Sequence, residues 1–123
     1  LYYKTSPFNI ASLKSSVIEI TNFQRDFPDS DYSEEMAYMK VLAQFDLSKS
    51  TIESKQKERY SEASKFYLEL IDKYPQSTYL KEGEKMYELS NKEVDRIAKL
   101  EAEYKTMLEK EKSTTSKVAT GPQ

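Results

Sequence analysis

Apolar residues recur every three or four positions along most of the chain, which is the spacing of amphipathic α-helices. Two of these patterns are followed closely by a proline, Pro28 or Pro75, and proline cannot continue a helix because it lacks an N–H group. A further helical pattern follows each proline. The predicted helices cover residues 10–26, the stretch from a cap at 29–31 to about 47, residues 58–73 and residues 79–110.

The two helix–proline–helix units match each other at a constant offset of 47 residues, which is typical of a helical repeat. Matched pairs are Ser16 with Ala63, Ile20 with Tyr67, Phe23 with Leu70, Pro28 with Pro75, Ser30 with Ser77, Tyr32 with Tyr79, Glu35 with Glu82 and Met39 with Met86. The repeat predicts an all-α fold of tetratricopeptide-like antiparallel helix pairs, an α-solenoid fragment with a long C-terminal helix. The residues expected to build this scaffold are Pro28, Tyr32, Tyr60, Ala63, Tyr67, Leu70, Pro75, Ser77 and Tyr79.

Other stretches have weaker patterns. Residues 48–57 are polar and predict either a loop or a frayed helical extension. In the last predicted helix the regular spacing of apolar residues is interrupted at Ser90–Asn91, where a kink or fraying is expected. Residues 1–4 predict the last turn of a helix that starts upstream, and residues 5–9 predict a turn with Asn9 as cap. We expect residues 1–111 to form the repeat domain, as a fragment of a longer array, and residues 112–123 to be a disordered tail.

Composition argues against catalysis. The 123 residues include no Cys and no His, which removes thiol nucleophiles, imidazole bases and the usual zinc ligands. No glycine-rich phosphate loop is present, and the acidic side chains lie beside lysines on polar helix faces. We therefore predict no enzyme, no catalytic residue, no cofactor and no metal. A net charge of −2 with mixed signs predicts no nucleic-acid partner.

The candidate partner-binding residues are Arg25, Tyr38, Arg59 and Arg96. Arginine is enriched in interface hot spots, and tyrosine offers an apolar body with a polar tip. The alternative for each arginine is a solvated helix face, because each has an acid nearby. The last helix also has an apolar stripe beyond Asn91 that no second helix of this chain would cover. Either a partner protein covers it, or it folds back on upstream repeats, or it frays.

The run ERYSEASKFYLELIDKYPQSTYLKEGEKMYE, with the preceding LYYKTS and the polar insert SKSTIESKQKE, resembles the C-terminal part of the BamD family, especially its Bacteroidota-type members. The resemblance covers residues 1–91. Ser16 and Ile20 depart from it, because Ala and an aromatic residue are usual there. The cysteine that carries the family's lipid is also absent from this chain.

The resemblance implies a tetratricopeptide-repeat lipoprotein on the periplasmic face of the bacterial outer membrane. Such a protein is a scaffold in the complex that assembles outer-membrane β-barrels. Its C-terminal repeats dock on the periplasmic POTRA domains of BamA, and its other partners are further subunits of the complex and unfolded outer-membrane proteins. Contact with the membrane would come only through the N-terminal lipid. The alternative is a generic tetratricopeptide module that binds an extended peptide tail in its concave groove.

Overall fold

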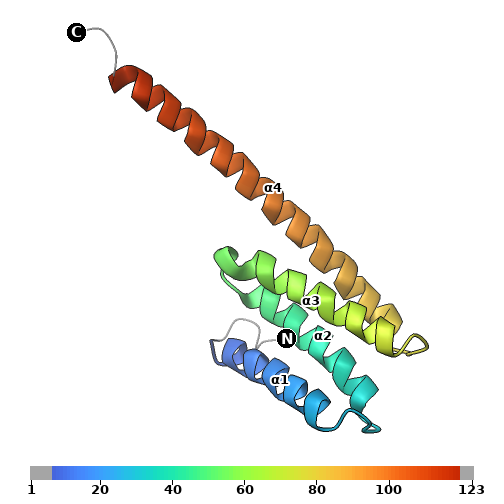
Figure 1. Cartoon of the computed structure of the whole chain (residues 1–123). Coiled ribbons are helices and arrows are strands. Elements are labelled where there is room, and N and C mark those ends of the chain that lie inside the picture. The colour runs from blue at the N-terminus through green and yellow to red at the C-terminus, as the bar shows by residue number, and fades with distance from the viewer. Residues whose placement is uncertain (1–6, 120–123) are drawn as a thin grey trace.

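Four α-helices and no strand make up residues 7–119, the part of the chain that the computed structural model describes (Figure 1). The all-α prediction is therefore confirmed. Figure 1 shows α1, α2 and α3 side by side, while α4 runs along α3 and then continues well beyond the other helices. The helices are α1 (Pro7–Asp26), α2 (Ser33–Ser50), α3 (Glu53–Lys73) and α4 (Leu80–Ala119).

The two proline turns are built alike. In the first turn, the Ser30 N–H donates to the Phe27 carbonyl (3.2 Å), and the Ser30 Oγ accepts the Tyr32 N–H (3.1 Å). In the second turn, the Ser77 N–H donates to the Tyr74 carbonyl (3.0 Å), and the Ser77 Oγ accepts the Tyr79 N–H (3.1 Å). The serines thus hold the turn that precedes each helix. The residue before α2, Tyr32, provides no side-chain cap.

The polar stretch at residues 48–57 is mostly helical, which agrees with the predicted helical extension rather than with a loop: residues 48–50 extend α2, and residues 53–57 begin α3. Only Thr51 and Ile52 separate α2 from α3, and both have extended backbone with ψ of 150°. The Thr51 hydroxyl donates to the Leu47 carbonyl (2.5 Å) at the end of α2. The stretch contains neither Gly nor Pro, and Lys, Gln and Glu are good helix formers, so helix is favoured wherever packing does not oppose it.

The predicted weak point in the last helix is absent. Helix α4 runs without interruption through Ser90 and Asn91. Ser90 is fully buried, and the Ser64 hydroxyl of α3 donates to the Asn91 Oδ1 (2.6 Å). Asn91 is therefore joined to α3 by a hydrogen bond, whereas the buried Ser90 hydroxyl has no hydrogen-bond partner among the described residues.

Both ends of the described chain are more helical than predicted. Helix α1 begins at Pro7, so residues 7–9 are helical where a turn was expected; proline is well suited to a first helical turn. Helix α4 continues to Ala119, so the predicted disordered tail is wrong for residues 112–119. The helical turn predicted at residues 1–4 and the end of the tail at 120–123 lie outside the described residues.

The core lies where α2, α3 and α4 meet. Val41 and Leu70 are completely buried, and Ala63 nearly so, which lets the helices approach closely. Tyr60 and Tyr67 are also buried there. Tyr32 differs from the prediction: it was expected to build the scaffold, yet its side chain is 65% exposed, and none of the described helices covers it.

Candidate partner-binding surfaces

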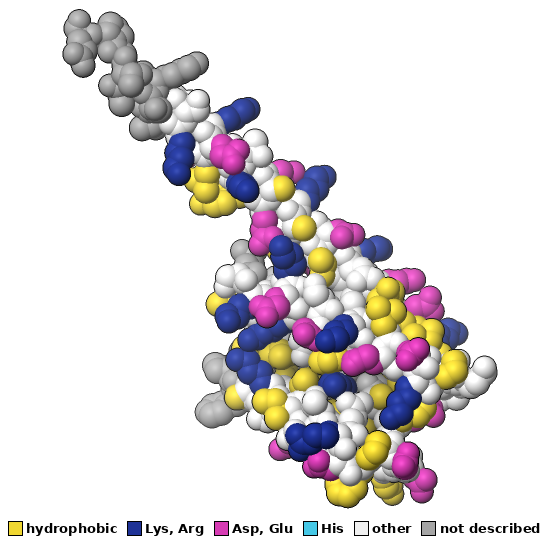
Figure 2. All heavy atoms as spheres, viewed as in Figure 1, with side chains coloured by type: hydrophobic (Ala, Val, Ile, Leu, Met, Phe, Trp, Pro, Cys, Tyr) yellow, Lys and Arg dark blue, Asp and Glu magenta, His cyan; other side chains and the backbone are white. Residues whose placement is uncertain are grey.

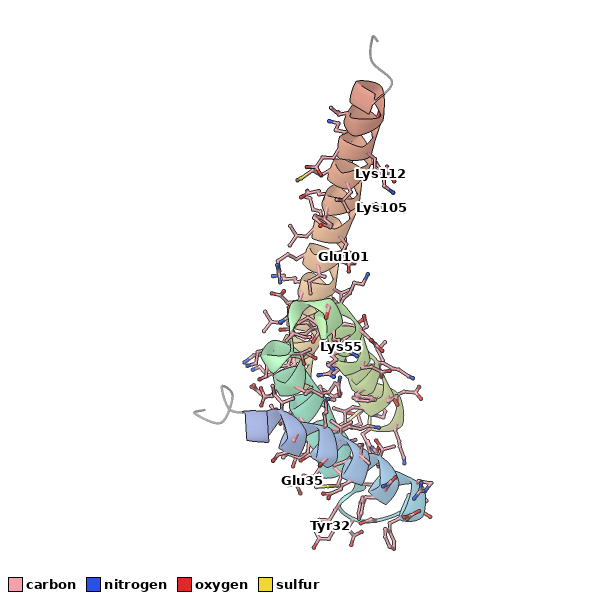
Figure 3. All side chains as sticks on the ribbon, turned by 90° about the vertical axis from the view of Figure 1, so that its left-hand side faces the viewer. Tyr32, Glu35, Lys55, Glu101, Lys105 and Lys112 are labelled. Carbon is pink, nitrogen blue, oxygen red and sulfur yellow. The ribbon has the colours of Figure 1, made fainter. Side chains whose placement is uncertain are left out.

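The outer half of α4 carries apolar side chains that no other described helix covers. The Lys57 Nζ of α3 pairs with the Glu101 Oε1 at 2.6 Å, close to the point where α4 leaves α3. Figure 3 shows Lys105 and Lys112 on α4 beyond the ends of the other helices. The exposed apolar side chains on this stretch are Leu100 (48% exposed), Tyr104 (62%), Met107 (57%) and Leu108 (42%), called the α4 stripe below.

The α4 stripe lies on one side of the helix. Its members follow at i, i+4, i+7 and i+8, which places them on one face. Ile97, the last buried residue among the described side chains of α4, precedes them at the same spacing. Residues 101–119 would extend about 28 Å at 1.5 Å per residue. The face that packs against α3 thus continues as an uncovered ridge.

The four predicted contact residues lie on four different helices, and no hydrogen bond, ion pair or ring contact of the described residues joins any two of them. Arg25 is exposed and its Nε donates to the Asp26 Oδ1 (2.9 Å). That hydrogen bond raises the pKa of Arg25 and lowers the pKa of Asp26. Arg96 pairs with Glu93 at 2.7 Å on α4, four residues before Leu100. Arg96 therefore lies beside the α4 stripe.

The other two predicted contact residues have internal partners. The Arg59 Nη1 donates to the Thr51 Oγ1 (2.7 Å), and the Arg59 carbonyl accepts the Gln44 side-chain amide (3.1 Å). Arg59 thus ties α3 to the end of α2. The Tyr38 ring stacks on Tyr79 with centroids 4.7 Å apart, and burial raises the pKa of Tyr38.

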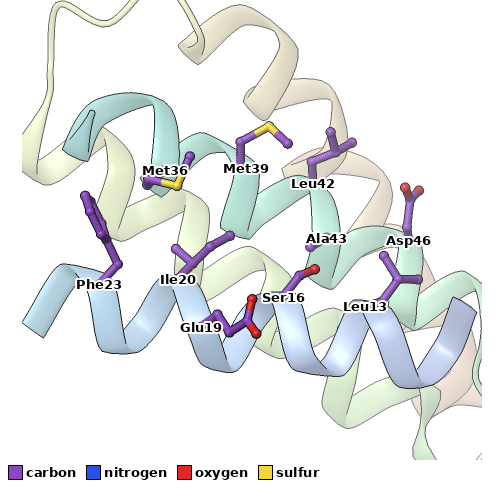
Figure 4. A pocket seen from close by; sticks show the side chains of 10 residues that line it. All are labelled: Leu13, Ser16, Glu19, Ile20, Phe23, Met36, Met39, Leu42, Ala43 and Asp46. Atoms are coloured by element: carbon purple, nitrogen blue, oxygen red, sulfur yellow. The ribbon is translucent and has the colours of Figure 1, made fainter. Parts of the chain in front are cut away.

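A second surface is the open cavity between α1 and α2, with a volume of about 360 Å³ (Figure 4). Figure 4 shows Leu13, Ile20 and Phe23 of α1 pointing toward α2. The lining residues are Leu13, Ser16, Glu19, Ile20, Phe23, Met36, Met39, Leu42, Ala43 and Asp46. Seven of them match, at the 47-residue offset, residues that are buried between α3, α4 and α2: Tyr60, Ala63, Tyr67, Leu70, Gly83, Met86 and Ser90.

A third surface is a groove of about 220 Å³ with residues of α1, α2 and α3 in its walls, called the α1–α3 groove below. Lys40 of α2 is only 8% exposed there. Its Nζ donates to the Gln24 Oε1 of α1 (3.1 Å) and lies 4.2 Å from the centre of the Phe66 ring. The groove is lined by Gln24, Ala37, Lys40, Phe66, Glu69, Leu70, Lys73 and Tyr74.

Lys40 was not among the predicted site residues, although a signal for it exists. It falls between Ala37 and Val41 on the buried face of α2, where the helical spacing calls for an apolar residue. The matched position of the second unit is Tyr87, which fits that expectation. A charged residue at such a position is costly to bury and therefore marks a candidate site.

Charge and metal chemistry add little to these surfaces. Figure 2 shows Lys and Arg side chains interspersed with Asp and Glu over the visible face, with no patch of one sign. Within residues 7–119, no cluster of acidic, His or Cys side chains could hold a metal ion. None of the four described helices combines the length and apolar character needed to cross a bilayer.

The comparison with protein families gives one match. The model of the family YfiO, described as outer membrane lipoprotein, matches residues 2–116. Searches of curated proteins and of solved structures found no significant match.

Proposed function

The chain belongs to the YfiO family of outer membrane lipoproteins, and on that premise we propose that it is a non-catalytic scaffold subunit of the complex that assembles outer-membrane β-barrels. Its partner in this proposal is the set of periplasmic POTRA domains of BamA. It would work at the periplasmic face of the outer membrane, in the manner of the Bacteroidota-type members that its sequence resembles.

The α4 stripe is the observation that carries the proposal. Leu100, Tyr104, Met107 and Leu108 form an apolar ridge on a rigid helix, which suits them to fill a groove in a folded partner. A few residues supply most of the binding energy at such contacts, and Tyr and Arg are among the commonest of them.

Arg96 supplies the charged part of the same surface. Its ion pair with Glu93 is exposed, and exposed pairs contribute only about 0–1 kcal/mol, so the arginine is free to exchange partners at little cost. An acidic group of the partner would satisfy the guanidinium beside the apolar ridge.

A titration of the full chain against the purified POTRA segment tests this proposal. We expect saturable binding that weakens by about tenfold or more in Arg96→Glu and in the pair Leu100→Ser with Met107→Ser. Lys85→Glu is the matched control, because Lys85 forms the same kind of exposed ion pair with the residue three positions earlier on α4, Glu82, and lies away from the α4 stripe. Equal binding by the wild type and the α4 variants, with helicity unchanged by circular dichroism, would exclude the α4 stripe as the docking surface.

A further inference from the structure

Glu111 lies in line with the α4 stripe, directly beyond its last apolar residue. It follows Tyr104, Met107 and Leu108 at i+7, i+4 and i+3, so it belongs to the same face of α4. Like the members of the stripe, Glu111 is exposed. The uncovered apolar ridge therefore ends in a carboxylate.

The neighbours of Glu111 distinguish it from the other acids in the outer part of α4. Glu101, Glu103 and Glu109 each have a lysine three or four positions away, where opposite charges attract each other on a helix. The same positions around Glu111 hold only apolar residues and threonines. Its two sequence neighbours are lysines, but adjacent residues of a helix do not face each other. No ion pair joins Glu111 to any residue that the structure describes, so its charge is available to a partner.

The opposite end of the α4 stripe carries a positive charge. Arg96 precedes Leu100 by four residues, which makes the two side chains neighbours on the helix. Arg96 and Glu111 are about 22 Å apart along the helix axis, at 1.5 Å per residue. Figure 1 shows that α4 leaves the other helices over this stretch. The exposed face thus presents a cation, an apolar ridge and an anion in that order.

We propose that this order of charges fixes the direction in which α4 lies on its partner. The partner surface is an apolar groove with an acidic group opposite Arg96 and a basic group opposite Glu111. The apolar side chains alone do not define a direction, because the ridge begins with Leu100 and ends with Leu108. In the reverse direction, like charges would meet at both ends, which disfavours that complex. The inference rests on the proposed function, and it adds Glu111 as the residue that determines the polarity of docking.

Isothermal titration of the full chain against the purified POTRA segment tests the inference. We expect Glu111→Lys to weaken binding by about tenfold, because an attraction is replaced by a repulsion. Glu111→Gln only removes the charge, so binding should weaken by about threefold and should depend less on salt concentration than in the wild type. Glu109→Lys is the matched control, because it makes the same change of charge on another face of α4 and should bind like the wild type.

A variant with both Arg96→Glu and Glu111→Lys exchanges the charges of the two ends. Its losses should add, so that it binds about a hundredfold more weakly than the wild type. Binding close to that of the wild type, with helicity unchanged by circular dichroism, would show that α4 can lie in either direction and would overturn the proposal.

Two other results would also overturn the proposal. One is wild-type affinity in Glu111→Lys, and the other is an equal loss in Glu111→Lys and Glu109→Lys, which would indicate an effect of net charge. In both cases, weaker binding by the pair Leu100→Ser with Met107→Ser would still support the α4 stripe as the docking surface. Absence of binding by the wild type would overturn the proposed function together with this inference.

Discussion

Gly83 is a buried helical glycine whose missing side chain makes room for Tyr67. A Cβ atom added at Gly83 would lie 2.8 Å from the Tyr67 Cδ1, 3.0 Å from its Cε1 and 3.7 Å from the Leu70 Cδ2. Ordinary carbon contacts lie at about 3.5–4.0 Å, so the Tyr67 ring would have to move by several tenths of an ångström or more. That ring is buried against Tyr87, which leaves it little freedom.

Two effects of Gly83→Ala oppose each other. Alanine is favoured over glycine by about 1 kcal/mol in a helix interior, while overpacking a core costs about 1–3 kcal/mol. Since the clash is with a buried ring, we expect a net loss of about 1 kcal/mol in the free energy of unfolding. With a urea dependence of about 1–3 kcal/mol per molar, the midpoint would fall by about 0.5 M. Urea titration followed by circular dichroism at 222 nm measures it.

The control for Gly83→Ala is the same substitution in a Tyr67→Val background. Valine has neither δ nor ε carbon atoms, which are the clashing ones, so only the helix preference should remain, and Gly83→Ala should then be neutral or stabilising by up to about 1 kcal/mol. Equal losses in both backgrounds would refute the steric account. A stabilised Gly83→Ala in the wild type would show that the Tyr67 ring is not held in place.

Two further predictions concern the same core. Ala63→Leu should lower the free energy of unfolding by about 1–3 kcal/mol, because it overpacks a buried contact. Ser16→Leu, at the matched position beside an open cavity, should lower it clearly less. Equal losses in urea titrations would contradict the difference in packing. Burial raises the pKa of Tyr38, Tyr60 and Tyr67, so above about pH 10 the unfolded chain releases phenol protons first and the free energy of unfolding falls as pH rises. In Tyr60→Phe the free energy of unfolding should fall less steeply with pH, because one buried phenol is removed. The lowered pKa of Lys40 has the opposite effect, since it makes the free energy of unfolding rise with pH. An unchanged slope in Tyr60→Phe would contradict the role given to Tyr60.

The sequence predicted the helices well where the signal is local. Pro28 and Pro75 stop α1 and α3 within a few residues whatever packs around them, and the helical spacing marks the stretches between the turns. The same reasoning left residues 48–57 undecided between loop and helix, and it placed a disordered tail at residues 112–119, which belong to α4. Apolar residues at helical spacing show only that one face of a helix is buried. A polar stretch without such spacing can therefore still be helical when its residues are good helix formers.

Candidate residues were harder to predict than helices, because their partners come from other helices. The α4 stripe could be inferred from spacing alone, since it needs only one helix. Arg59 and Tyr38 were chosen for their side-chain chemistry, yet Thr51 and Tyr79, which engage them, could not be identified before the helices were placed. Lys40 was missed for the opposite reason. A lysine is expected on the exposed surface, and nothing in its side-chain chemistry marks it until its burial is known.

The matched positions of the two units show that burial depends on the neighbouring helix as much as on the residue itself. Leu70 is fully buried because α2 packs over the second unit, while its counterpart Phe23 is only half-buried, since none of the described helices packs over the same face of the first unit. Met86 is likewise buried and its counterpart Met39 exposed.

The same comparison separates α4 into two parts. Val41 and Phe45, buried on the face of α2 that meets α3, correspond to Glu88 and Lys92 of α4, which are exposed. The repeat-like part of α4 is therefore polar where another repeat helix would pack. Helix α2 ends at Ser50, which corresponds to Ile97, so residues 98–119 have no counterpart in the first unit. The α4 stripe lies wholly in that added part. Its apolar residues are thus not explained by stacking of repeats, which favours a role in binding a separate partner.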